Sequence, residues 1–179
     1  MTDKENLETG NKGFTLVEAM VTMLIFSILA GGLYAMLRAG DSSWQTNRVR
    51  VELQQELRKA IEWMKNDLRE AGTSSIVDVP ADGNWYTTIT FKTPSGVSGG
   101  TIIWNTDTIQ FLIGGMGGTQ LLRTSGGASK VIAQSVSSVQ FRRQPSSSDV
   151  LEIALQGQKN TTQGNTINYQ LDYKIQLRN

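Results

Sequence analysis

The first hydrophobic pattern in the chain is a long apolar run near the N-terminus. Nineteen consecutive uncharged and mostly apolar residues extend from Ala19 to Leu37, and Arg38 follows them. A helix needs about 20 such residues to cross the hydrocarbon core of a bilayer, which is roughly 30 Å thick. The run therefore predicts a membrane-spanning helix. Glu18 stands at its start, where a carboxylate is costly and is a candidate for function.

A second pattern follows between Asp41 and Ala71, where apolar residues recur at steps of three and four. This is the period of a helix with one apolar face. The apolar positions are Val49, Leu53, Leu57, Ala60, Ile61, Met64, Leu68 and Ala71. Gly72 provides a stop signal. If both patterns join, residues 14–71 form one helix, roughly 87 Å long at 1.5 Å per residue.

After Gly72 the period of the pattern changes to two, which is typical of β-strands. Breaks rich in glycine, serine and asparagine, such as residues 95–100 and 125–129, separate the expected strands. The strands are expected at residues 85–92, 101–104, 107–113, 120–124, 137–143, 150–156 and 168–177. In the last of them apolar and polar residues alternate, so its apolar face can cover the helix. We therefore expect an α+β fold, a long N-terminal helix packed on a C-terminal antiparallel sheet.

Composition removes several classes of function. The chain has 179 residues and contains neither cysteine nor histidine, which excludes zinc sites of the usual kind and serine–histidine–aspartate triads. Seventeen basic and 16 acidic side chains give a formal charge of +1, which argues against an electrostatic nucleic-acid binder. We expect no enzyme active site, no cofactor and no direct nucleic-acid partner.

The residues before the apolar run do not fit an ordinary signal peptide. Such a peptide has a basic start, an apolar core of about 7–15 residues and a small-residue cleavage site beyond it. Here the side chains of residues 1–13 sum to −1, the apolar run is longer, and no clear A-x-A site follows. A plain membrane anchor fits better but leaves Glu18 unexplained.

The segment KGFTLVE, residues 12–18, resembles the signal of type IV prepilins and type II secretion pseudopilins. This resemblance implies that a membrane prepilin peptidase cuts after Gly13. It also implies that Phe14 becomes the N-methylated first residue of the mature chain. Glu18 would then be the fifth mature residue, the position at which that family carries a glutamate.

Physical chemistry gives the implied cleavage a consequence for Glu18. The cut creates a positive α-amine on Phe14, and Glu18 lies four residues later, on the same face of the helix. It also lies in the first turn, where the helix dipole favours a negative charge. The amine of Phe14 from the same chain or from a neighbouring subunit can offset the cost of placing this carboxylate in an apolar environment. The sequence leaves both possibilities open.

The segment LQQELRKAIEWMKNDLREAG, residues 53–72, resembles J-type minor pseudopilins and W-type minor pilins. The resemblance implies a bacterial inner-membrane protein that crosses the membrane once and has an extracytoplasmic head. Its partners would be membrane lipid, the assembly platform, the major subunit and other minor subunits in a priming or tip complex. The implied parts are a leader at 1–13, a membrane helix at 14–37, an amphipathic helix at 38–72 and a head at 73–179. The alternative function is a membrane-anchored binding module for a glycan or exoprotein.

Other candidate sites have simpler interpretations. The aspartates in or beside loops lack calcium-loop spacing, so we expect no metal site but solvated turns at Asp78, Asp82, Asp107 and Asp149. The glycine-rich segment 114–118 lacks the features of a phosphate loop and predicts a flexible hairpin. We expect Arg142 and Arg143 at a solvated strand edge. We expect core or helix–sheet packing for at least two of the tryptophans Trp44, Trp63, Trp85 and Trp104.

Overall fold

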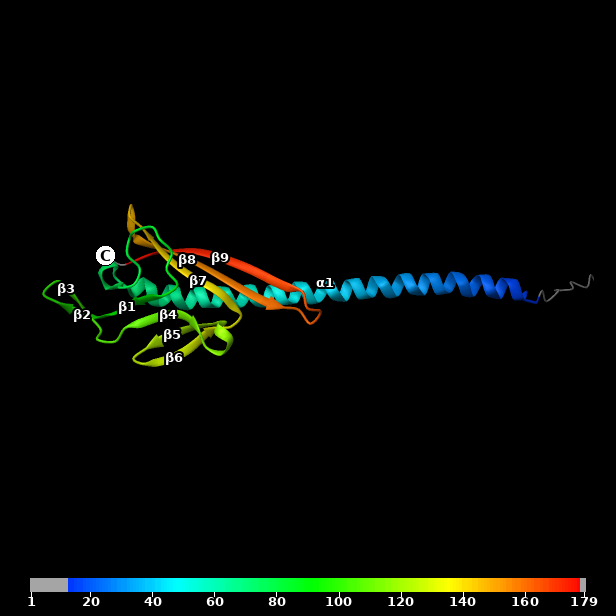
Figure 1. Ribbon diagram of the computed structural model, residues 1–179, viewed down its shortest axis with the longest axis horizontal. Helices are drawn as coiled ribbons and strands as arrows, with labels where there is room; N and C mark the ends of the chain where they lie inside the picture. The colour runs from blue at the N-terminus through cyan, green and yellow to red at the C-terminus, as the bar shows by residue number, and fades with distance from the viewer. Residues whose placement is uncertain (1–12, 178–179) are drawn as a thin grey trace, which may run out of the picture. The chain divides into compact units, whose positions relative to one another are not determined.

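The computed structural model describes residues 13–177, so residues 1–12 of the expected leader and the last two residues lie outside the described part. One long helix, α1, extends over Leu16–Glu70 (Figure 1). The two helical patterns of the sequence therefore do join. Compared with the predicted range 14–71, α1 begins two residues later and ends one residue earlier. The chain divides into two compact units, one ending at Ser43 and one beginning at Trp44.

The first unit contains the apolar part of α1. All the large apolar side chains between Leu16 and Leu37 are exposed to solvent. By length and composition, α1 is the one helix among the described residues that is able to cross a membrane. An apolar helix with no buried face needs lipid or protein around it, because exposed apolar surface is costly in water.

The second unit places antiparallel sheets against the rest of α1, which confirms the α+β class. A four-stranded sheet has the order β1 (Ile89–Phe91), β4 (Ile109–Gly114), β5 (Gln120–Ser125), β6 (Ala128–Ala133). A three-stranded sheet consists of β7 (Val136–Gln144), β8 (Ser147–Asn160) and β9 (Thr166–Gln176). Strands β2 (Pro94–Ser98) and β3 (Thr101–Trp104) form a separate hairpin. Short 3₁₀ turns lie at Thr73–Ser75 and Met116–Gly118.

The core of the second unit lies between α1 and the two larger sheets. The apolar stripe that the sequence predicts is buried on α1 at Leu53, Leu57, Ala60, Ile61, Met64 and Leu68. Three phenylalanines from the sheets, Phe91, Phe111 and Phe141, are also fully buried, and the ring centroids of the first two lie 5.9 Å apart. In β9, as predicted, residues facing the core alternate with exposed ones.

One glycine sets the distance between α1 and the three-stranded sheet. A Cβ atom at Gly157 of β8 would lie 2.8 Å from Leu53 Cδ1, 3.0 Å from Leu57 Cδ1 and 3.0 Å from the Ser135 carbonyl oxygen. Two of these neighbours belong to the buried stripe and the third is backbone. The helix can therefore approach this strand only because residue 157 has no side chain.

The strand predictions need several corrections. Of the predicted strand 85–92, only Ile89–Phe91 is β1, although Tyr86 forms a separate bridge to Phe141. The predicted breaks at 95–100 and 125–129 contain most of β2 and the start of β6. The β7–β8 ladder is longer than predicted as well, and so is the β8–β9 ladder, which continues to Asn160 and Thr166. These segments are strands because their backbones pair with neighbouring strands. Their side chains are small or polar and do not alternate with apolar ones, so the sequence pattern did not predict them.

The expectation for Arg142 and Arg143 is correct in one respect and wrong in another. They lie on β7, an edge strand of its sheet, as expected, but their side chains are not freely solvated. Arg143 is only 7% exposed, and it donates from Nε to the Ser148 carbonyl at 2.8 Å and from Nη1 to the Val79 carbonyl at 3.2 Å. Burial lowers the pKa of this guanidinium. Arg142 is partly buried and bonds to Glu152 of the next strand. Both arginines are held by partners, and Arg143 is almost completely removed from solvent.

The tryptophans are absent from the buried core. Trp44, Trp63 and Trp85 are exposed to a large extent, and Trp104 is intermediate. Two of them pack against cations of the sheets: Lys130 Nζ lies 4.3 Å from the Trp63 ring centroid, and Arg142 Cζ lies 4.2 Å from that of Trp85. Trp63 thus packs between α1 and a sheet at the surface. The sequence predicts core or helix–sheet packing for at least two tryptophans, and only this one shows it. Phenylalanine fills the core because it has no N–H that needs a partner.

Candidate functional site at the start of the first helix

The backbone around the expected cleavage site is open. Gly13, Phe14 and Thr15 precede α1 and have no regular secondary structure. The Phe14 side chain is 76% exposed, and a Cβ atom at Gly13 would meet nothing within 4 Å. A protease needs an extended and accessible backbone, and a glycine leaves the greatest freedom to adopt one. The geometry of Gly13 and Phe14 is compatible with cleavage between them.

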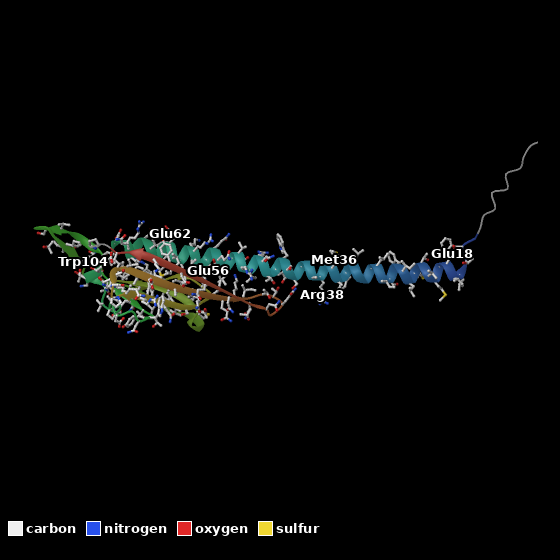
Figure 2. The ribbon with its side chains drawn as sticks, turned by 90° about the horizontal axis from the view of Figure 1, so that it is seen from above. Glu18, Met36, Arg38, Glu56, Glu62 and Trp104 are labelled. Atoms are coloured by element: carbon white, nitrogen blue, oxygen red, sulfur yellow. The ribbon has the colours of Figure 1, made fainter. Side chains whose placement is uncertain are left out.

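Thr15 and Glu18 cap the first turn of α1 reciprocally. The Glu18 backbone N–H donates to Thr15 Oγ1 at 3.2 Å, and the Thr15 backbone N–H donates to Glu18 Oε2 at 3.3 Å. The Thr15 hydroxyl also donates to Glu18 Oε2 at 3.2 Å. This is the capping box, in which a threonine and a glutamate three residues apart satisfy N–H groups that the helix leaves unpaired. Figure 2 shows Glu18 in this first turn.

The sequence analysis missed this role of Glu18. The signal was present, because threonine followed three residues later by glutamate, directly before an apolar run, marks a helix start. The capping bonds give the carboxylate a partner within its own chain before any new N-terminus exists. A carboxylate accepts several hydrogen bonds on its two oxygens, so capping leaves room for an added cation.

The threonine and serine hydroxyl groups in the apolar part of α1 are satisfied within the helix. Thr22 Oγ1 donates to the Glu18 carbonyl at 2.8 Å and approaches the Ala19 carbonyl at 2.9 Å. Ser27 Oγ donates to the Met23 carbonyl at 2.8 Å. Such bonds lower the cost of placing a hydroxyl in hydrocarbon, where no water is available. They make this part of α1 compatible with a bilayer despite its polar residues.

Polar contacts between α1 and the sheets position the second unit. Glu52 of α1 bonds to Lys159 of β8 at 3.0 Å and to Arg48 at 3.0 Å, and the Lys159 bond is the main cause of a lowered pKa at Glu52. Asp67 pairs with Arg123 of β5 at 2.6 Å. Each larger sheet is thus joined to α1 by an ion pair as well as by the core. These residues hold the fold and are not assembled into a reactive group.

The loop aspartates do not come together. Among residues 13–177, no group of three or more acidic side chains is placed to hold a metal ion. Asp82 accepts hydrogen bonds from the Tyr86 hydroxyl at 2.5 Å and from the Asn84 backbone N–H at 2.9 Å. The Tyr86 bond is the main cause of a lowered pKa at Asp82, and the same bond raises the pKa of Tyr86. Asp82 therefore stabilises its own turn.

Comparison with known proteins addresses the start of the chain. Residues 9–34 match the family model described as the prokaryotic N-terminal methylation motif. The comparison with curated proteins found no match. The motif points to a structural pilin-type protein that a prepilin peptidase processes, and not to an enzyme. The chain thus carries a prepilin-type methylation motif at the start of a long apolar helix, an arrangement consistent with a type IV pilin-like protein.

Proposed function

We propose that this chain is the precursor of a minor pilin or pseudopilin, a low-copy subunit of a type IV pilus or a type II secretion pseudopilus. One observation carries the proposal. Residues 9–34 match the methylation motif, and within them an open Gly13–Phe14 backbone lies directly before a capped apolar helix. The minor-subunit role, in a priming or tip complex, rests on the resemblance of residues 53–72 to J-type and W-type subunits.

In this proposal the peptidase hydrolyses the peptide bond between Gly13 and Phe14 on the cytoplasmic side. The charged leader is released, and the amine of Phe14 is then methylated. The apolar part of α1 stays in the inner membrane and later packs in the filament, while the head stays outside the cytoplasm. The energy for that transfer comes from a partner ATPase and the assembly platform, as the resemblance to pilins and pseudopilins implies.

Glu18 has two successive partners in this proposal. In the precursor, the Thr15 N–H and hydroxyl hold its carboxylate. After cleavage, the Phe14 amine of the same or a neighbouring subunit adds a cation. A carboxylate removed from water without a cation is expensive, so this second partner becomes important when the subunit leaves the bilayer edge for the filament.

Mass spectrometry of the protein from cells with an active prepilin peptidase tests the processing step. We expect a mature chain that begins with N-methylated Phe14. Gly13→Val should block cleavage, because a bulky side chain next to the scissile bond obstructs the peptidase and removes the conformational freedom of glycine. Gly10→Val is the matched control within the leader and should be processed. A chain that keeps Met1 would contradict the proposal.

Quantitative mass spectrometry of sheared filaments tests the minor role. We expect the processed chain in filaments at a small fraction of the principal subunit. Equal abundance would contradict a minor role. A processed chain that never enters filaments would favour the alternative of a membrane-anchored binding module. The neighbouring genes discriminate the two systems, since secretin and other pseudopilin genes indicate secretion and pilus assembly genes indicate a pilus.

A further inference from the structure

The outward face of the three-stranded sheet contains a hollow of about 450 Å³. Its floor is Ala154, at the centre of β8, which pairs with Gln140 of β7 on one side and Asp172 of β9 on the other. The neighbouring β8 residues Ile153 and Leu155 belong to the core, so Ala154 points away from it. Long side chains surround this small one, and Ala154 is only 8% exposed although it faces solvent.

An ion-paired row forms one wall of the hollow. Arg142, Glu152 and Lys174 lie opposite one another on adjacent strands. Arg142 Nε donates to Glu152 Oε2 at 2.8 Å, and Lys174 Nζ lies 2.7 Å from Glu152 Oε1. The Glu152 side chain is 11% exposed, so both of its oxygens are occupied and largely covered. The carboxylate and the cations of this row satisfy one another.

Amide side chains form the opposite wall. Gln156 Nε2 donates to Gln170 Oε1 at 3.0 Å, and Gln170 Nε2 donates to Asp172 at 3.0 Å. Gln140 lines the same wall. With Arg142 and Lys174 against Glu152 and Asp172, the charges lining the hollow sum to zero. The remaining hydrogen-bonding capacity belongs mostly to neutral amides.

Trp85 stands at the rim. The bridge between Tyr86 and Phe141 holds the Trp85 loop beside β7, with backbone bonds of 2.8 and 2.7 Å. Arg142 lies against the indole ring, and Trp85 is 40% exposed. The cation orients the ring and leaves part of the indole uncovered at the hollow. Aromatic side chains beside a few well-placed polar groups are typical of ligand-binding sites.

These features discriminate between classes of ligand. An anion gains little, because both cations already pair with Glu152 or pack on Trp85. An apolar ligand would cover the remaining donors and acceptors of the amides without offering them partners, which costs free energy. A neutral sugar satisfies each group: its hydroxyls donate to and accept from the glutamines, and its ring C–H face packs on the indole. We propose that this hollow binds a neutral saccharide.

The hollow is shallow and open, so it suits one or two rings of a longer glycan. Binding there requires neither cleavage at Gly13 nor assembly into a filament. The inference therefore stands apart from the proposed function, and failure of either leaves the other untouched.

The test uses the full chain in micelles of a detergent without a sugar head group, because maltoside detergents would compete. Phenylalanine replaces Trp44, Trp63 and Trp104, which leaves Trp85 as the sole source of tryptophan fluorescence. The probes are neutral hexasaccharides of glucose, mannose and N-acetylglucosamine, followed by an array of neutral bacterial glycans. We expect a saturable change in Trp85 emission with at least one neutral saccharide.

Substitutions in and beside the hollow test whether the saccharide binds there. Ala154→Leu fills the floor and Trp85→Ala removes the aromatic surface. Isothermal titration calorimetry measures saccharide binding to these variants, because Trp85→Ala removes the fluorescent reporter. Each substitution should weaken binding by about tenfold or more. Gln176→Leu, on the same face of β9 and outside the hollow, is the matched control and should keep the wild-type affinity. Near-ultraviolet circular dichroism and melting temperature check that each variant folds.

Three results would overturn the inference. The first is an absence of binding by every neutral glycan tested. The second is binding that both Ala154→Leu and Trp85→Ala leave unchanged, since the ligand would then lie elsewhere. The third is saturation of Trp85 emission by an acidic or mixed hexapeptide with no response to sugars.

Discussion

At the scale of single residues, Glu18 combines two roles that a carboxylate can fill at a helix start. Its charge suits the positive end of the helix dipole, and its oxygen accepts hydrogen bonds from Thr15. Capping needs only an acceptor, whereas pairing with a new α-amine needs the charge. Glutamine is an acceptor without a charge, so the two roles can be separated by mutation.

We expect Glu18→Gln to keep the capped first turn and the cleavage after Gly13, but to lose incorporation into filaments. Glu18→Ala should lose both the cap and incorporation. Hydrogen exchange of the first-turn amides in micelles measures the cap, and the subunit content of sheared filaments measures incorporation. Normal incorporation of Glu18→Gln would show that capping alone explains the residue.

Substitution of Thr15 tests the other half of the capping pair. Thr15→Ala should raise exchange rates in the first turn and weaken the helix start by about 1 kcal/mol, because an N-cap oxygen is lost. Thr15→Ser keeps the hydroxyl and is the matched control, with exchange rates close to those of the wild type. Equal protection in the alanine variant would contradict the capping role.

Glu152 makes the stability of the head depend on pH. The bond from Lys174, and next the bond from Arg142, lowers the pKa of Glu152 from its ordinary value of 4.5. The ion pairs therefore add stability above pH 4.5, and this contribution is lost as the pH falls through the lowered pKa. We expect Glu152→Gln to melt at a lower temperature at neutral pH and to converge on the wild type in acid. A constant difference in melting temperature across that range would argue against this linkage.

At the scale of elements, the contact between α1 and β8 depends on the absence of a side chain. Gly157→Ala would place a Cβ within 3.0 Å of Leu57 Cδ1 and closer still to Leu53. We expect a loss of about 1–3 kcal/mol in the free energy of unfolding, which is typical of overpacking. Gly96→Ala in β2 is the matched control, since its Cβ would meet nothing within 4 Å. Denaturant unfolding of the two variants compares them directly.

At the scale of the whole molecule, the buried core lies entirely within the second compact unit, which begins at Trp44. Every described residue of its core cluster, and every residue packed against that cluster, lies between Val49 and Leu177. Removal of residues 1–43 therefore takes away no buried contact of this core. We expect the fragment 44–179 to be soluble and to unfold cooperatively with a melting temperature within about 3 °C of the head in the full chain. Calorimetry measures this, and a molten fragment would show that the membrane unit is needed for folding.

The sequence alone determined the features that depend on local pattern. The apolar run, the stripe of α1 and the α+β class could be derived from spacing and residue type. The prepilin signal was recognised by the resemblance of residues 12–18 to a known family, and residues 9–34 match the methylation motif. The capping pair Thr15–Glu18 belongs to the same group, because its signal spans only four residues. These features are predictable because neighbours within one or two helical turns decide them.

Only the tertiary structure decided the features made by residues distant along the chain. Strands β2 and β6 carry no alternating pattern, so their backbone pairing could not be derived from side chains. The need for a glycine at position 157 arises only because Leu53 and Leu57 pack against it. Arg143 is buried because it finds carbonyls at Val79 and Ser148. The hollow over Ala154 exists because three strands and the Trp85 loop meet there, and chain proximity encodes none of these contacts.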